Sequence, residues 1–156
     1  MMSTTLTRPG FARLIAAAAA AVGALAARPA SAAGKSHKVV FHVDRNEPAT
    51  MNQALNNMTN VAQNYTGAGE QVEMELVAYG PGLHMLRADT SPVKDRLASI
   101  KQSIPDVTFS ACNVTKTAME KVEGRPIEIV PQARIVPGGV VRIIELEEAG
   151  WSYVKP

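Results

Sequence analysis

The segment Lys38-Val-Val-Phe-His-Val43 is a nearly continuous apolar run that is rich in β-branched residues. Such a run is typical of a strand buried on both faces of a parallel sheet, because a half-exposed strand would alternate with polar residues. The following segment, Asp44-Arg-Asn-Glu-Pro48, interrupts the run, and Pro48 stands where a helix can begin. Together the two segments predict the first strand and helix of an α/β domain.

The spacing of apolar residues then predicts a helix of four turns. Apolar residues recur three or four positions apart, which places them on one helical face. They are Met51, Ala54, Leu55, Met58, Val61, Ala62 and Tyr65. Gly67 and Gly69 end this helix, because glycine is favoured just beyond a last helical residue.

Strands and helices continue to alternate to the end of the chain. Further strands are predicted over residues 72–79, 107–111 and 151–154, and further helices over residues 91–104, 113–122 and 140–147. Residues 127–136 hold two short β-branched pieces broken by Pro131, and they supply the remaining strand. This order predicts a single α/β domain with an open, mainly parallel five-stranded sheet and helices on both faces, a flavodoxin-like architecture.

The N-terminus has the parts of a secretory signal peptide. Arg8 and Arg13 flank the start of an apolar stretch over residues 14–27, and Ala30-Ser31-Ala32 matches a cleavage site. The apolar stretch is shorter than the ~20 residues that a membrane span needs. We therefore expect residues 1–32 to be removed near Ala32 and the protein to be exported to a bacterial periplasm. An uncleaved membrane anchor is the alternative.

The expected mature chain has a short polar lead-in at residues 33–37 and one α/β domain at residues 38–156. The whole chain carries 16 basic and 14 acidic residues, and three of the basic residues but no acidic ones lie in residues 1–32. Without that segment the counts are 13 and 14, a net charge of −1. This balance argues against nucleic-acid binding. We also expect no membrane association once the signal is removed.

Polar residues follow three of the predicted strands at their carboxyl ends. In a parallel sheet these ends share one edge, and folds of this class bind ligands there. The first strand supplies His42, Asp44 and Arg45, the second supplies Tyr79 and His84, and the third supplies Ser110, Cys112 and Asn113. The sequence therefore predicts a site at this edge.

Cys112 is the only cysteine, and in Val107-Thr-Phe-Ser-Ala-Cys112-Asn-Val-Thr it stands where a strand meets a helix. A helix N-terminus favours the thiolate, the reactive form. We expect the backbone N–H groups of Asn113 and Val114 to stabilise the anion, and Lys116 can add positive charge. The alternative is a buried thiol that packs as a small hydrophobe. Export favours a functional thiol, because an exposed free cysteine is a liability in an oxidising compartment.

Two histidines and one arginine are further candidates. His42 can act as a base or as a partner of the thiolate, or it can be a hydrogen-bonded core histidine in an apolar strand. His84 follows a Gly-Pro-Gly turn and can cover the site. Arg45 can add positive charge near the thiol. Each of the three residues can also have a purely structural role.

Several kinds of site find no support in the sequence. Close ligand spacings of zinc sites, a Cys-x-x-Cys-His haem motif and a resolving cysteine of thioredoxin type are all absent. Phosphate-binding glycine-rich loops and the Gly-x-Ser-x-Gly motif of esterases are absent as well. The leading hypothesis therefore includes no metal and no cofactor.

The chain resembles the DsrE/DsrF-like family, in its exported branch. The resemblance covers nearly all of residues 38–156. It rests on Lys38-Val-Val-Phe-His-Val43, on Val77-Ala-Tyr-Gly-Pro-Gly82, on the segment around Cys112, and on the tail over residues 136–156. It implies a compact α/β fold and homo-oligomers, typically trimers or hexamers. In the sulfur-relay members of this family, a cysteine at the Cys112 position accepts and passes on a persulfide.

These observations lead to the hypothesis of an exported sulfur-handling protein, a sulfur carrier or sulfurtransferase. Cys112 would take a sulfane sulfur from a donor and deliver it to an acceptor, with proteins or small thiols as the partners. One alternative is a non-enzymatic oligomeric module that binds a small ligand, haem or copper at the strand ends. Another is a structural oligomer whose thiol is incidental.

Overall fold

The structure is a computed structural model that describes Met1 and residues 34–156. The expected signal peptide and its cleavage near Ala32 lie outside these residues. Within the part of the chain that is described, no helix has both the length and the apolar character needed to cross a membrane.

Five strands form one sheet in which all neighbours run parallel. They are β1 (Ser36–Val43), β2 (Gln71–Ala78), β3 (Val107–Cys112), β4 (Ala133–Val136) and β5 (Ser152–Val154). Their order across the sheet is β4-β3-β2-β1-β5. The chain therefore steps outward from β1 to β4 and then returns to the other side of β1. The predicted five-stranded, open α/β fold is confirmed.

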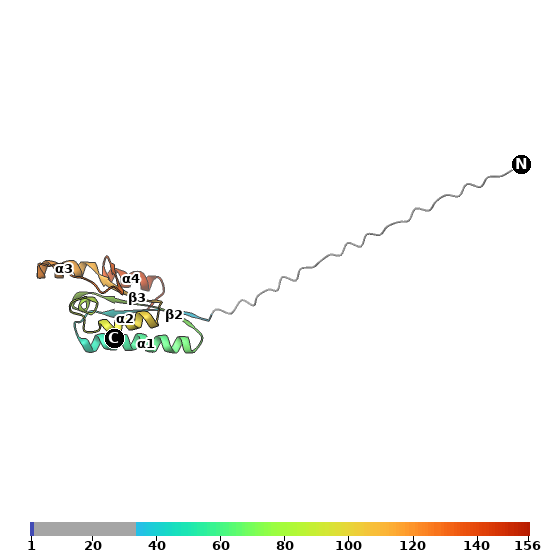
Figure 1. The fold of residues 1–156 in the computed structure, drawn as a ribbon, viewed down its shortest axis with the longest axis horizontal. Coiled ribbons are helices and arrows are strands. Elements are labelled where there is room, and N and C mark those ends of the chain that lie inside the picture. Colours follow the sequence, from blue (N-terminus) through green and yellow to red (C-terminus); the bar gives the residue numbers. More distant parts are fainter. Residues whose placement is uncertain (2–33) are drawn as a thin grey trace. The chain divides into compact units, whose positions relative to one another are not determined.

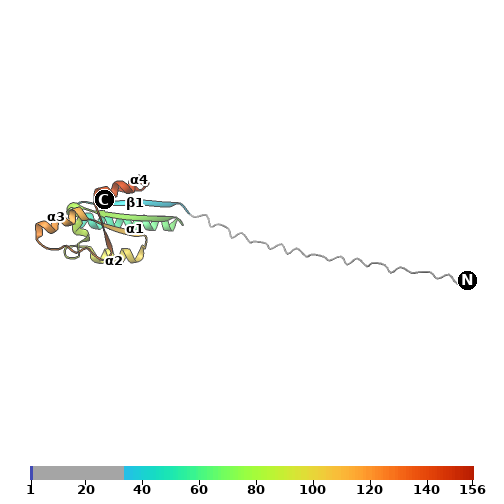
Figure 2. The same cartoon turned by 90° about the horizontal axis from the view of Figure 1, so that it is seen from above.

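Helices cover both faces of the sheet, as predicted (Figures 1 and 2). They are α1 (Pro48–Gly67), α2 (Lys94–Ser103), α3 (Asn113–Glu123) and α4 (Gly139–Glu148). Helices α1 and α2 pack on the face to which β1 contributes Val39, Phe41 and Val43. Helix α4 packs on the opposite face, against Val40 and Val77. Because α4 carries the chain back across the sheet, a right-handed crossover places it on this second face.

The two faces of the sheet contribute unequally to the hydrophobic core. The α1 and α2 face carries a large cluster that includes the fully buried Phe41, Leu76 and Phe109. On the α4 face the buried cluster is far smaller, and α4 contributes only Ile143 and Leu146 to it. Each fully buried large apolar side chain adds about 1.5–3 kcal/mol. Most hydrophobic stabilisation therefore comes from the first face, and the second has room for polar groups.

The segment after β2 differs from its sequence-based expectation. Gly80–Leu86 forms a 3-10 helix, η1, where the sequence predicted only a turn and a short apolar piece. A side chain on Gly82 would collide with the backbone carbonyl of Val43. Glycine at this position therefore allows η1 to lie directly against the end of β1.

The segment over residues 127–136 also divides differently. Only Ala133–Val136 joins the sheet, whereas Ile129 makes a single antiparallel bridge to Arg87. The N–H of Val130 donates to the carbonyl of Leu86 over 2.9 Å. Pro131 separates the two pieces and has no N–H to donate to a ladder, so one strand cannot run through both.

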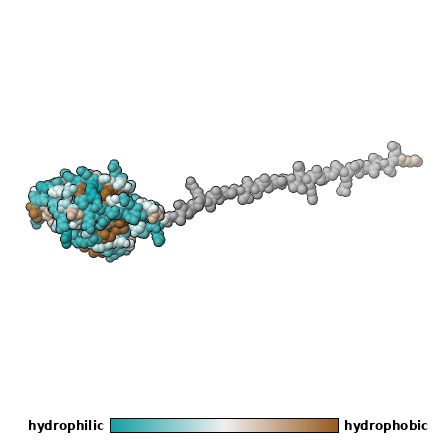
Figure 3. Space-filling view, turned by 90° about the horizontal axis from the view of Figure 1, so that it is seen from below, coloured by the Kyte–Doolittle hydropathy of each residue, from teal (hydrophilic) through white to brown (hydrophobic). Residues whose placement is uncertain are grey.

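Exposed apolar side chains gather mainly on two helices. The face in Figure 3 is largely hydrophilic, with small separate apolar areas. Among the described residues, large exposed apolar side chains on α3 are Val114 and Val122, and those on α4 are Val140, Val141 and Ile144. Helix α3 has no buried residue at all. Part of the apolar surface of α3 and of α4 is therefore exposed in the single chain.

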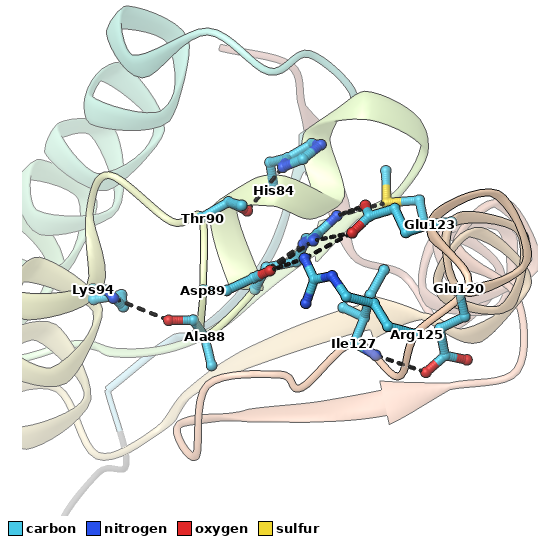
Figure 4. Close-up of polar contacts among 11 residues, drawn as sticks. His84, Ala88, Asp89, Thr90, Lys94, Glu120, Glu123, Arg125 and Ile127 are labelled. Carbon is cyan, nitrogen blue, oxygen red and sulfur yellow. Dashed lines mark hydrogen bonds and ion pairs between the residues drawn. The ribbon is translucent and has the colours of Figure 1, made fainter.

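A buried arginine fixes the end of α3 against η1 through the carboxylates of Asp89 and Glu123, which Figure 4 shows facing one another. Arg87 is 1% exposed, and its guanidinium donates to both oxygens of Asp89 over 2.9 and 2.8 Å. It also donates to both oxygens of Glu123, over 2.5 and 3.0 Å. Arg125 pairs with the same two carboxylates from the exposed side. The cluster therefore joins residues that directly follow η1 to the last residue of α3.

We expect the substitution Arg87→Met to lower the free energy of unfolding by about 3 kcal/mol, because both carboxylates lose their buried partner. The matched control is Arg125→Met, which removes an arginine of the same cluster that is half exposed and should cost far less. Urea unfolding of both variants measures the difference. Equal losses of unfolding free energy in the two variants would show that burial does not strengthen the contribution of Arg87.

Arg87→Met should also change how the free energy of unfolding depends on pH. Hydrogen bonds from Arg87, and then from Arg125, hold the pKa of Asp89 below its usual range. The stability that Asp89 contributes is therefore complete above about pH 4 and declines as the pH falls from there toward its folded pKa. We expect Arg87→Met to weaken this acid dependence in unfolding curves taken at pH 5, 4 and 3. An unchanged dependence would contradict the assignment.

Candidate functional site

The carboxyl ends of β1, β2 and β3 bring His42, Tyr79 and Cys112 to one edge of the sheet. Ala78 pairs with Ala111, so Tyr79 and Cys112 stand side by side just beyond the last paired residues. Because side chains alternate along a strand, all three project toward the face that α4 covers. Strand β2 separates His42 from Cys112 by two strand spacings, roughly 10 Å. Tyr79, which directly follows β2, lies between them.

Cys112 is the last residue of β3 and the N-cap of α3. Its Sγ accepts a hydrogen bond from the backbone N–H of Thr115 over 3.5 Å. Side-chain oxygens of serine or aspartate make this contact at many helices. The thiol is free, and the residue is 4% exposed. The sulfur therefore faces N–H groups that the helix leaves unpaired in its first turn.

Thr115 contributes its hydroxyl as well as its N–H. The hydroxyl oxygen accepts the backbone N–H of Gly80 over 2.9 Å. The same hydroxyl helps to lower the pKa of the Cys112 thiol. Thr115 is thus bonded to the first residue of η1 through its hydroxyl and to the sulfur through its N–H.

A second helix N-terminus lies close to the same sulfur. Gly139 is the first residue of α4, and its N–H, like that of Val114, helps to lower the pKa of the Cys112 thiol. A Cβ on Gly139 would lie 2.8 Å from the Cβ of Tyr79, too close for a real contact. Glycine at this position therefore lets α4 begin beside Tyr79 and Cys112.

These donors lower the pKa of the thiol. Burial opposes ionisation of Cys112, but hydrogen bonds from the hydroxyl and N–H of Thr115, and from the N–H groups of Gly139 and Val114, hold the pKa below its usual value. The positive ends of two helix dipoles act in the same direction. The site therefore holds a thiolate more readily than a free cysteine does.

His42 belongs to a neighbouring cluster at the end of β1. Its ring stacks on that of Tyr79 with centroids 4.5 Å apart, and its Nδ1 lies 2.7 Å from the hydroxyl oxygen of Tyr153. Nε2 is buried and has no hydrogen-bond partner among the described residues; the Asp44 carboxylate is 3.9 Å away. Burial lowers the pKa of His42, opposed by Asp44 and assisted by Lys155. At neutral pH His42 is thus an uncharged ring that supports Tyr79.

Arg45 and His84, two sequence-predicted candidates, are engaged elsewhere. Arg45 is exposed, and its nearest carboxylate is that of Glu47 at 3.8 Å. His84 lies in η1, where its Nδ1 is 2.8 Å from the Thr90 hydroxyl (Figure 4). No hydrogen bond in the described part of the chain joins either residue to Sγ of Cys112.

Lys116 and Asn113 lie on α3 near the thiol but do not contact it through hydrogen bonds in residues 34–156. The Lys116 ammonium pairs with Glu120 at 2.5 Å, and Asn113 is exposed. The sequence predicted the N–H groups of Asn113 and Val114 as the donors. In the structure the hydrogen bond to Sγ comes from the N–H of Thr115, and the N–H groups of Val114 and Gly139 also lower the pKa of the thiol. The Asn113 N–H is not among these groups.

The sequence analysis did not identify Thr115 or Gly139. A threonine three residues after a helix-capping residue was a usable signal for the first, because that position faces the cap. Gly138-Gly139 at the start of α4 was a weaker signal for a close backbone approach. No cluster of three or more His, Cys, Asp or Glu side chains in the described residues is arranged as a metal site.

Comparisons with known proteins support the fold alone. No model of a known protein family matches the chain, and no curated protein matches it. The chain is similar to a solved structure, that of MTH1491, a protein of unknown function from Methanobacterium thermoautotrophicum. The two share 27% sequence identity with a TM-score of 0.66, over 77% of this chain and 99% of that one. This similarity establishes a common α/β fold.

Proposed function

We propose that this chain is an exported sulfur-handling protein of the DsrE/DsrF-like type, in which Cys112 accepts sulfane sulfur and passes it on as a persulfide. The observation that carries the proposal is the position of Sγ at the N-terminus of α3, where the Thr115 N–H donates to it; the Thr115 hydroxyl and the first N–H of α4 further lower the pKa of the thiol. A thiol that only filled space would need none of these donors. They favour the thiolate, which is the form that attacks sulfur.

The proposed reaction has two steps that balance without a cofactor. The Cys112 thiolate attacks the terminal sulfur of a donor persulfide; the new Sγ–S bond forms as the donor's S–S bond breaks, and the donor leaves as a thiolate. An acceptor thiolate then attacks the terminal sulfur, which restores the Cys112 thiolate and leaves the acceptor as a persulfide. The N–H groups around Sγ stabilise the anion before the first step and after the second.

The supporting residues divide into two groups. His42 acts through the packing of its ring on Tyr79, the residue beside Cys112, and provides no charge of its own at neutral pH. Arg45 and His84 lie at the same edge of the sheet, where they can contact a docked donor or acceptor. Lys116 is paired with Glu120 and adds positive charge only at longer range.

The proposed partners are a sulfur donor, a sulfur acceptor and further copies of this chain. Donor and acceptor are proteins or small thiols, and the working assembly is a homotrimer or homohexamer. The exposed apolar side chains of α3 and α4 support an assembly built from these helices. The proposed location is the bacterial periplasm, which rests on the signal-like segment at residues 1–32.

A second candidate function is a binding module without turnover. It is favoured by the 4% exposure of Cys112, which restricts access to Sγ, and by the buried, unpartnered Nε2 of His42. A small ligand, haem or copper at the strand ends would then be held rather than transformed. Absorbance spectra and metal analysis of the purified protein distinguish the two candidates.

The first test is sulfur loading. Incubated with a low-molecular-weight persulfide, the protein should gain about 32 Da, one sulfur atom, by intact mass, and Cys112→Ser should gain nothing. Subsequent addition of a thiol acceptor should remove the added mass. A wild-type protein that stays unloaded, or a Cys112→Ser variant that loads equally, would refute persulfide chemistry at Cys112.

The second test addresses thiol activation. Thr115→Val removes the hydroxyl donor but keeps the N–H, so alkylation of Cys112 at pH 7 should slow by about three- to tenfold. The midpoint of the rate against pH should move to higher pH. Thr115→Ser should restore the wild-type profile. Thr117→Val, at an exposed position of the same helix, controls for the effect of valine on α3. An unchanged Thr115→Val profile would exclude the hydroxyl as a donor.

A further inference from the structure

A cluster of charged side chains on the α4 face makes no hydrogen bond to the thiol within residues 34–156. Glu75, in β2, is 2% exposed, and both of its oxygens accept hydrogen bonds. Arg142 of α4 donates to each oxygen over 2.8 Å, and the Ser110 hydroxyl donates over 2.7 Å. Arg134 of β4 adds a further hydrogen bond over 3.0 Å. One buried carboxylate is thus held between two guanidinium groups.

Glu75 does not need the second guanidinium, that of Arg134, for charge balance or for hydrogen bonding. Arg142 alone neutralises the carboxylate, and together with Ser110 it satisfies both oxygens. Arg134 therefore brings a surplus positive charge. Its side chain is 52% exposed, yet its Nε is anchored to the Ser110 hydroxyl over 3.2 Å. Its Nη1 makes no hydrogen bond within residues 34–156. An anchored guanidinium with an unused donor is organised to bind an anion.

A small cavity lies beside these arginines at the start of α4. Its volume is about 120 Å³, and its walls include Arg134, Arg142, Val136, Gly138 and Val141. Pockets for cofactors and drug-sized ligands usually exceed ~300 Å³, so this cavity suits a small ion. Gly138 is the N-cap of α4 and offers no side-chain cap, so the positive end of the helix dipole faces the same region.

The carboxylate of Glu145 repels an anion at this position. Glu145 also lines the cavity, and its carboxylate lies 3.4 Å from Nη1 of Arg142. The Glu145 side chain is 56% exposed, so water screens the pair and an entering anion can displace it. Glu145 therefore tunes the affinity of the cavity, and its removal should increase that affinity.

We propose that Arg134, Arg142 and the N-terminus of α4 form a binding site for a small tetrahedral dianion of the sulfate or phosphate type. Nη1 of Arg134, and Nη1 of Arg142 once Glu145 is displaced, offer N–H donors to such oxygens. Cys112 does not line the cavity. The thiol is therefore not part of the site, although both lie near the start of α4, and anion binding does not depend on the proposed sulfur transfer.

Isothermal titration calorimetry of the full chain with sulfate, in a buffer of low ionic strength, tests the proposal. We expect saturable one-to-one binding, weakened about tenfold in Arg134→Gln. Arg134→Lys keeps the charge and should lose less affinity, and Glu145→Gln should bind more tightly than the wild type. The control Arg96→Gln, on α2 beside Asn52 and Asn56, should bind as the wild type does.

A parallel titration with inorganic phosphate identifies the preferred anion, and binding of either anion with the expected response to the variants supports the site. Cys112→Ser should leave sulfate binding unchanged. Absence of saturable binding for both anions would overturn the proposal. Unaltered affinity in Arg134→Gln, with an unfolding curve like that of the wild type, would overturn it as well.

Discussion

The buried carboxylate of Glu75 determines how the α4 layer is held on the sheet. A carboxylate that is 2% exposed costs several kcal/mol unless charged and hydrogen-bonding partners replace water. Burial opposes ionisation of Glu75, but hydrogen bonds from Arg142 and Ser110 and the charge of Arg134 keep its pKa below the usual value. Its partners come from α4, β3 and β4. One charge thus ties a helix and three neighbouring strands together.

This tie bears directly on the thiol. Only Gly139, Ile143 and Leu146 of α4 are buried, so hydrophobic contacts alone hold the helix weakly. Arg142, one turn from Gly139, fixes the start of α4 through Glu75. The N–H of Gly139 at that start helps to lower the pKa of the Cys112 thiol. The polar cluster in the middle of the sheet therefore helps to position a donor at its edge, and the ionisation of the thiol depends on the seating of α4.

Periodicity was enough to predict the fold because the elements that matter have strong local signals. A doubly buried strand such as β1 must be apolar at nearly every position, and α1 must repeat its apolar residues at helical spacing. The position of Cys112 at a strand end followed from the same patterns. Its donors did not, because Gly139 approaches through tertiary packing and the role of the Thr115 hydroxyl depends on Gly80. Likewise η1 forms because Gly82 can lie against Val43, a contact that periodicity does not encode.

The uneven covering of the sheet explains why the chemistry lies where it does. The face under α1 and α2 is filled with apolar side chains, and a polar group there would displace packing worth several kcal/mol. The other face is covered by α4, which arises when the chain reverses direction across the sheet to place β5 beside β1. Strand positions that point to this face can carry Glu75, Ser110 and Cys112 because each finds hydrogen-bond partners there. The reversal of the chain thus creates both the polar face and the helix end that the thiol uses, so the topology and the site have a common origin.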